Sequence, residues 1–257
     1  MTLKIANNQA KGIERGVYYF DLEDYPHVKA KELEAILAFI KYEKSYGRET
    51  EVICEDDNIL SVVDNAIKSS EFSEINYTPK EVEFVYHATS IKATCAILSE
   101  GKLLSASKVY GKTGAELAYE KRNSPWNDPA DYFEYIMFCN GDDMTGDYVV
   151  LSGDFPCEDD LQKGNFNPGV RFCFRYMDIV KHPGYRFDGY HPVKVKDEIV
   201  LSDYLHSCIL PEQYKNELTC HILPGLETKV HYLPQDGLSI SDWNNKVYDF
   251  VVKMQNK

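Results

Sequence analysis

The sequence of 257 residues lacks the features that would place it in several specialised classes. No apolar run approaches the ~20 residues that a membrane helix needs. The first residues, Met1 to Gln9, lack the basic and then apolar layout of a signal peptide. There is no internal repeat and no low-complexity segment. With 44% hydrophobic and 27% charged residues, the composition is that of an ordinary globular protein, which we expect in the cytoplasm without membrane partners.

A cysteine framework and a metal site are also missing. The seven cysteines are odd in number and scattered, and no Cys-x-x-Cys occurs. Cys208, Cys220 and His221 lack the paired spacing of zinc ligands, and the acidic residues between positions 142 and 160 lack the spacing of a calcium loop. The pattern predicts reduced thiols and no metal.

Basic charge is scarce, since 28 Lys and Arg face 41 Asp and Glu, which gives a net charge of −13. This balance opposes broad attraction to a phosphate backbone, although a nucleotide read in a small pocket is still allowed. No Gly-x-Gly-x-x-Gly follows a strand, so a dinucleotide would not bind in the Rossmann manner. Gly111-Lys112-Thr113 resembles part of a phosphate loop, but Ala106 stands where that loop needs its first glycine.

The pattern of expected helices and strands changes near the end of the first third of the chain. Residues 16–75 read as strand, helix, strand, helix, with helical spacing over 29–46 and 58–68. The polar stretch 69–80 predicts a boundary, so we expect a small α/β accessory domain over 1–80 and a second domain over 81–257. The second domain has many short β-runs and few helices, which indicates a mixed α+β fold built on curved sheets. Its expected strands begin at Glu83, Tyr135, Tyr148, Val170, Glu198 and Cys208, its expected helices cover 91–100 and 242–254, and 108–129 is expected to be a loop.

Two segments of the second domain carry candidate chemistry. In the first, a strand ends in His87-Ala88-Thr89, a helix follows, and Gly101 ends that helix before Ser105. In the second, Glu198 opens an apolar strand, and an Ile-Leu-Pro strand follows. Taken alone, each residue also has a structural interpretation. His87 could be a histidine that is hydrogen-bonded to the backbone, and Glu198 could be a charged residue that prevents further strand pairing at the edge of a sheet.

In combination, the order of these motifs resembles the ADP-ribosyltransferase superfamily. The match comprises His-x-Thr, helix, Gly-x-Leu, several strands, then Glu at a strand start, over about residues 82–225. It is most similar to the histidine-bearing branch and to DarT-like nucleic-acid ADP-ribosyltransferase toxins. The resemblance implies a curved split β-sheet core with peripheral helices, NAD as substrate, and an antitoxin or regulatory partner. It also implies transfer of ADP-ribose to a nucleic-acid base or a protein side chain, in a bacterial toxin or defence enzyme.

The resemblance also implies roles for particular residues. Glu198 would be the catalytic glutamate, which stabilises positive charge on the anomeric carbon as the nicotinamide leaves. His87 would bind ribose hydroxyl or nicotinamide amide, with Thr89 nearby. The remaining cofactor-binding candidates are Ser105 and one aromatic residue, Tyr135 or Phe138, that would stack on nicotinamide.

Two questions are left open, namely which basic residue lies beside the substrate and which class of function the chain has. Such toxins place an arginine beside the substrate, and the candidates for that position here are Lys121, Arg122, Arg171 and Arg175. The alternatives to a transferase are an NAD-dependent RNA 2′-phosphotransferase on the same scaffold and a non-catalytic module that binds a nucleotide or protein.

Overall fold

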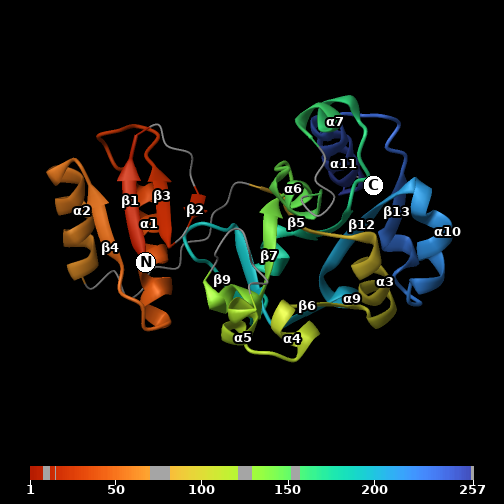
Figure 1. The fold of residues 1–257 in the computed structure, drawn as a ribbon, viewed down its shortest axis with the longest axis horizontal. Coiled ribbons are helices and arrows are strands. Elements are labelled where there is room, and N and C mark those ends of the chain that lie inside the picture. Colours follow the sequence, from red (N-terminus) through yellow and green to blue (C-terminus); the bar gives the residue numbers. More distant parts are fainter. Residues whose placement is uncertain (8–11, 15, 70–81, 121–128, 152–156, 256–257) are drawn as a thin grey trace.

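A computed structural model of the chain describes residues 1–7, 12–14, 16–69, 82–120, 129–151 and 157–255. Its first sheet lies at one end of the molecule and a larger sheet occupies the rest (Figure 1). The boundary predicted within 69–80 falls almost wholly on 70–81, outside the described residues. Several sheets and many helices together make a mixed architecture that is compatible with the predicted α+β class.

The N-terminal sheet has four strands in the order β2-β3-β1-β4, and β1 pairs in parallel with both β3 and β4. Its elements are β1 (Thr2–Ala6), β2 (Gly12–Glu14), β3 (Val17–Asp21), α1 (Ala30–Ser45), β4 (Glu51–Cys54) and α2 (Asp57–Lys68). The predicted helices 29–46 and 58–68 are confirmed by α1 and α2. The central strand β1 was not predicted, although Leu3 and Ile5 alternate with polar residues and are buried.

The larger sheet has seven strands in the order β13-β12-β8-β5-β7-β10-β9, and a separate two-stranded sheet pairs β11 with β6. The seven strands are β5 (Phe84–Thr89), β7 (Tyr135–Asn140), β8 (Val170–Arg175), β9 (Tyr185–Arg186), β10 (Val193–Lys196), β12 (Leu205–Pro211) and β13 (Val230–Leu233). The smaller sheet comprises β6 (Lys102–Leu104) and β11 (Glu198–Val200). Most pairs are antiparallel, whereas β12 and β13 run parallel.

The helices of this part cover both faces of the larger sheet (Figure 1). They are α3 (Ile91–Glu100), α4 (Ala106–Tyr110), α5 (Gly114–Tyr119), α6 (Thr145–Leu151), α7 (Glu158–Lys163), α8 (Tyr176–Ile179), α9 (Leu201–Tyr204), α10 (Lys215–Leu218) and α11 (Ile240–Gln255). Short 3-10 turns are η2 (Ala130–Glu134), η3 (Glu212–Tyr214), η4 (Thr219–His221) and η5 (Glu227–Lys229). Ser90 caps the start of α3 and Gly101, at a φ of 68°, ends it, so this helix has its predicted bounds.

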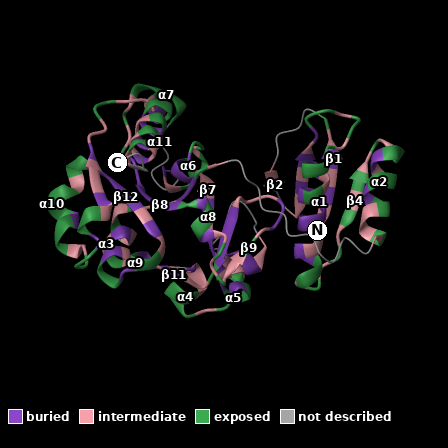
Figure 2. Ribbon diagram, turned by 180° about the vertical axis from the view of Figure 1, so that it is seen from behind, coloured by how far each residue is buried: buried purple, intermediate pink, exposed green. Residues whose placement is uncertain are grey.

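Alternation along the strands gives the larger sheet two distinct cores. Val85 and Phe138 face the core that also contains residues of α3, β6, β11 and α9. Tyr86 faces the opposite core, beneath Trp243 of α11. The central strands of this sheet are therefore buried on both faces, and β7 and β8 carry buried residues in Figure 2.

Two sequence predictions for this part were wrong. The apolar run 148–151, expected as a strand, lies in α6, because Gly146 allows close packing on the Tyr86 ring and Asp147 pairs with Arg171 beneath the helix. The loop expected over 108–129 begins with the helices α4 and α5, whose starts are capped by Ser105 and Thr113. Residues 121–128 of that loop lie outside the described residues.

A buried lysine joins the two sheets. Lys194 on β10 has no exposed surface, and its Nζ lies 2.9 Å from Asp188 Oδ2. The same Nζ lies 3.6 Å from the ring centroid of Tyr42 on α1, 4.1 Å from that of Tyr132 and 4.8 Å from that of Tyr135. We call Lys194, Asp188 and these three tyrosines the lysine cage.

Further polar contacts surround this cage. Arg48 Nη1 lies 2.6 Å from Asp131 Oδ1, and Arg48 Nε lies 2.6 Å from Glu43 Oε2. The Tyr18 hydroxyl on β3 donates a hydrogen bond to the Gly189 carbonyl at 3.0 Å. The N-terminal sheet and α1 are therefore bound to the second part of the chain through buried and half-buried polar groups.

The structure also bears on membranes, thiols and metals. Among the described residues, every helix is too short or too polar to span a bilayer. All seven cysteines are free thiols. Within the described ranges, no three His, Cys, Asp or Glu side chains come together as a metal site requires.

Candidate functional site

His87 lies near the end of the central strand β5, on the same face as Val85 and Phe138. Its Nδ1 lies 2.9 Å from the carbonyl oxygen of Met137. A carbonyl only accepts hydrogen bonds, so Nδ1 carries the hydrogen and donates it, and Nε2 of the neutral ring is an acceptor. Burial lowers the pKa of His87, and the bond to Met137 offsets this only in part. His87 is therefore a neutral imidazole whose Nε2 can accept a hydrogen bond from a ligand hydroxyl or amide.

The two aromatic candidates lie on opposite faces of β7. The Phe138 ring centroid is 6.2 Å from that of His87, and the Phe138 side chain is 1% exposed. The Tyr135 hydroxyl lies 2.5 Å from the Tyr46 hydroxyl, inside the contact between the two sheets. Both rings are buried, so the structure brings Phe138 to His87 without presenting an open ring face at either position.

Thr89 and Ser105 flank the helix that follows His87. Thr89 is the last residue of β5 and pairs with Val170. Ser105 is buried at the start of α4, where its hydroxyl accepts a hydrogen bond from the Lys108 amide at 3.4 Å. The Ser105 amide donates to the Asp197 carbonyl at 2.8 Å. Ser105 thus fixes the residue that precedes Glu198.

Glu198 begins β11 directly after a tight turn. Asp197 has a φ of 65°, and its amide donates to the Glu134 carbonyl at 3.0 Å. This left-handed residue redirects the chain from β10 of the larger sheet into β11 of the smaller one. Glu198 then pairs with Leu104 of β6, and Lys102 Nζ lies 3.2 Å from both carboxylate oxygens of Glu198. The carboxylate is 46% exposed and therefore open to a ligand.

Strand register limits the distance between the two motifs. His87 lies beside Phe138 when the β5–β7 register is extended by one residue, and Phe138 pairs with Val193 of β10. Glu198 follows Val193 by five residues. Two strand spacings and five residue rises place the two Cα atoms within about 20 Å. The neighbouring residue Ile199 is fully buried in the core that His87 faces, while Glu198 lies on the more open side of β11.

Two residues near Glu198 were not predicted from the sequence. Lys102 stands within the Gly-x-Leu motif and becomes the cationic partner of the carboxylate. His182 lies near enough for the Glu198 charge to act on its ring. For His182, only the His-Pro-Gly turn at 182–184, just before β9, could have indicated a fixed position.

The basic residues considered for the substrate do not meet at this site. Arg171 is buried on the opposite face of the sheet, where it pairs with Asp147 and its Nη2 donates to Asn244 Oδ1 at 2.7 Å. Arg175 lies four residues further along β8, on the same face as Arg171. Lys121 and Arg122 lie outside the described residues.

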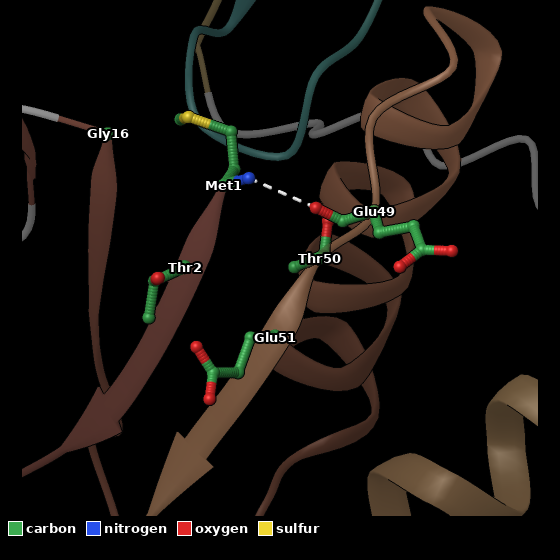
Figure 3. A pocket seen from close by; sticks show the side chains of 6 residues that line it. All are labelled: Met1, Thr2, Gly16, Glu49, Thr50 and Glu51. Carbon is green, nitrogen blue, oxygen red and sulfur yellow. Dashed lines mark hydrogen bonds between the residues drawn. The ribbon is translucent and has the colours of Figure 1, made fainter.

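A hollow of about 470 Å³ lies elsewhere, where β1 and β4 begin. Figure 3 shows its lining, in which the Met1 ammonium group donates to the Glu49 carbonyl at 3.0 Å. The remaining lining residues are Thr2, Gly16, Thr50 and Glu51. It is a shallow opening on the N-terminal sheet, and none of the predicted site residues borders it.

Comparisons with known proteins identify no relative: no family model, no curated protein and no solved structure matches this chain.

Proposed function

We propose that the chain is an NAD-dependent ADP-ribosyltransferase that moves ADP-ribose from NAD to a nucleic-acid base or a protein side chain. The observation that carries the proposal is the pairing of β11 with β6. Through it, Glu198 becomes the neighbour of Leu104, which closes the segment that begins at His87. Motifs separated by 111 residues, from 87 to 198, are thereby joined by one helix and one strand pair.

The roles follow from the chemistry of the two groups. His87 is neutral and offers Nε2 as an acceptor for a ribose hydroxyl or the nicotinamide amide. Glu198 is an accessible carboxylate paired with Lys102. When the bond between nicotinamide and ribose breaks, positive charge develops on the anomeric carbon. A fixed carboxylate beside that carbon therefore stabilises the transition state more than the ground state. The same carboxylate can accept the proton of the incoming nucleophile.

Transfer from labelled NAD tests this proposal. The wild type should label a macromolecule in a lysate or in a panel of DNA, RNA and protein acceptors. Glu198→Gln keeps the size of the side chain and removes its charge, so transfer should fall by about 100-fold or more. Asp203→Asn is the matched control, because Asp203 is an exposed acid on the next helix and should leave transfer unchanged. Equal rates for wild type and Glu198→Gln would refute the role of Glu198.

A toxin role has its own test. If the activity is toxic, expression of the wild type should arrest bacterial growth, and expression of Glu198→Gln should not. Equal growth with both proteins, at matched expression, would contradict a toxin role without affecting the enzymatic assignment.

A second candidate function, a non-catalytic module that binds a nucleotide or protein, has one observation in its favour. Phe138 and Tyr135 are both buried, so neither presents an open ring face beside His87. Saturable binding of NAD without release of nicotinamide, in both wild type and Glu198→Gln, would support this function over a transferase.

A further inference from the structure

We propose that Lys102 is a positioning residue for Glu198, whose carboxylate it holds in one orientation. The proposal deepens the function proposed above and rests on it. Its basis is direct contact, since Lys102 Nζ donates to both carboxylate oxygens of Glu198, each at 3.2 Å. Equal distances place the ammonium group between the two oxygens. A turn of the carboxylate away from this position therefore lengthens at least one of the two hydrogen bonds.

The pairing of β6 with β11 sets the separation of the two side chains. Glu198 stands opposite Leu104, and Lys102 stands opposite Val200. Lys102 and Glu198 are therefore diagonal neighbours on one face of the two-stranded sheet, a separation that a long side chain spans. The middle residue of each strand is buried on the other face, so the pair lies on the more open face.

Hydrogen bonds at both ends hold the backbone of this sheet. At one end the Ser105 amide donates to the Asp197 carbonyl at 2.8 Å, and at the other end the Leu201 amide donates to the Gly101 carbonyl at 2.9 Å. Gly101 also ends α3 with a φ of 68°, so the chain turns from α3 directly into the strand that carries Lys102. The backbone beneath both side chains is therefore fixed on both sides of the pair.

The exposure of the pair favours an orienting role over a structural one. The side chains of Lys102 and Glu198 are 40% and 46% exposed. An ion pair that water reaches to this extent contributes little to folding. A lone glutamate at such a position samples several rotamers, and the ammonium group favours the one in which both oxygens accept its hydrogens.

The contact also leaves part of the carboxylate open to a ligand. A carboxylate has about four lone-pair positions, two on each oxygen. Lys102 lies between the oxygens and takes one position on each. The two outer positions point away from the lysine, where they can accept a ribose hydroxyl and the proton of the incoming nucleophile.

During transfer Lys102 keeps its proton. The bond between nicotinamide nitrogen and the anomeric carbon breaks, and its electron pair leaves with nicotinamide. The nucleophile forms its bond to the same carbon and gives its proton to the Glu198 carboxylate. A carboxylate oxygen beside that carbon lies closer to it than the ammonium group does, so attraction of the developing charge outweighs the repulsion by Lys102. The direction in which the carboxylate faces the carbon is fixed before reaction.

Two substitutions at position 102 test the proposal in opposite ways. Lys102→Arg keeps a cation whose N–H groups can donate to both oxygens, whereas Lys102→Met keeps most of the length and donates nothing. Lys102→Arg should retain kcat to within about 3-fold, and Lys102→Met should lower kcat by about 10- to 100-fold with little change in the KM for NAD. Because the pair is exposed, both variants should melt within about 4 °C of the wild type.

Lys108→Met is the matched control. Lys108 is an exposed lysine whose Nζ lies 3.9 Å from Asp197 Oδ1, so its loss removes the same charge beside Glu198 without a contact to the carboxylate. It should change neither constant. Equal losses in Lys102→Met and Lys108→Met would show that charge alone matters, and a raised KM with unchanged kcat would make Lys102 a ligand of NAD. Either result, or an equal loss in Lys102→Arg, would overturn the proposal.

A second measurement does not depend on activity. A water-soluble carbodiimide joins a carboxylate to an amine in contact with it, because the amide bond forms as the carbodiimide takes up the elements of water and becomes a urea. Mass spectrometry of the digested full chain should find a crosslink between positions 102 and 198 in the wild type and none in Lys102→Arg. Absence of the crosslink from the wild type would refute the contact.

The two experiments separate this proposal from the function on which it rests. If the wild type transfers ADP-ribose, Glu198→Gln does not, and Lys102→Met matches the wild type, the enzymatic function stands and the positioning role fails. If the crosslink forms but the wild type transfers nothing, the contact stands, while the proposed enzymatic function fails and the positioning role fails with it.

Discussion

Replacement of Lys194 by Met should destabilise the chain strongly, because it removes the buried ammonium group that pairs with Asp188 in the lysine cage. Asp188 is fully buried and accepts hydrogen bonds from the Tyr132 hydroxyl at 3.0 Å and from the His191 amide at 2.8 Å. Burial alone would raise the Asp188 pKa, but Lys194 and His191 lower it well below its usual value. Without Lys194 the ionised Asp188 stays buried and has lost its ammonium partner.

The size of the effect follows from two contributions. Breaking a buried ion pair by removing one partner typically costs about 3–5 kcal/mol. A desolvated cation over aromatic rings adds up to about 2 kcal/mol, part of which the Met side chain replaces by packing. We expect Lys194→Met to lower the free energy of unfolding by about 3–5 kcal/mol, a large part of the 5–15 kcal/mol that is usual for a domain.

Urea unfolding followed by circular dichroism measures this loss. Lys163→Met is the control, because Lys163 forms an exposed pair with Asp159 and should change stability by less than about 0.5 kcal/mol. The double variant Lys194→Met with Asp188→Asn should be more stable than the sum of the two single changes predicts, by about 2 kcal/mol. A cost below about 1 kcal/mol for Lys194→Met would show that the cage does not hold the charge as described.

Two further predictions concern the same contact and the histidines. Gly189 has a φ of 79°, and a Cβ there would lie 2.3 Å from the Ala35 carbonyl oxygen. Gly189→Ala should therefore lower the free energy of unfolding by about 2 kcal/mol or more, measured in urea. In the control Gly47→Ala the added Cβ would meet no atom within 4 Å, so the cost should be about 1 kcal/mol, from the positive φ alone. Burial lowers the pKa of His87, so between pH 6.5 and that lowered value the unfolded chain binds a proton that the folded chain does not. Stability should therefore fall as the pH drops below about 6.5, by up to about 1.4 kcal/mol per pH unit for this group, and His87→Gln should flatten that slope between pH 7.5 and 5. An identical slope in the variant would place the acid sensitivity elsewhere.

Local signals in the sequence were sufficient for several elements of the second part. The bounds of α3 follow from Ser90 as its cap and Gly101 as its left-handed end, and both act within a few residues. The strand starts at Tyr135 and Glu198 follow from apolar runs bordered by polar residues. Such elements are predictable because their stabilising contacts lie close along the chain.

Pairing between elements that are distant in the chain could not be predicted from the sequence. The apolar run 148–151 fits a strand by its residue types, yet it forms α6, because the contacts of Gly146 and Asp147 with β5 and β8 decide its conformation. Likewise, the pairing of β11 with β6 depends on the left-handed turn at Asp197, which no residue type specifies.

Lys194 was the least predictable residue of this kind. In the sequence it alternates with Val193 and Val195 as an exposed strand residue would, and lysine is almost never fully buried unless it is paired. Its burial requires Asp188 from the preceding turn and Tyr42 from α1, 152 residues earlier in the chain.

The position of Lys194 ties the N-terminal sheet to the candidate site. Lys194 precedes Glu198 by four residues, and the β10 strand between them is held at Lys196 by Gly184 and at Asp197 by Glu134. Tyr42 of α1 closes the cage over Lys194 in β10, the strand that leads through the turn at Asp197 to Glu198 at the start of β11. Separation of α1 from the cage would expose a buried ion pair to water and release β10 at the same time. We therefore expect the N-terminal sheet and α1 to affect the candidate site through the position of β10.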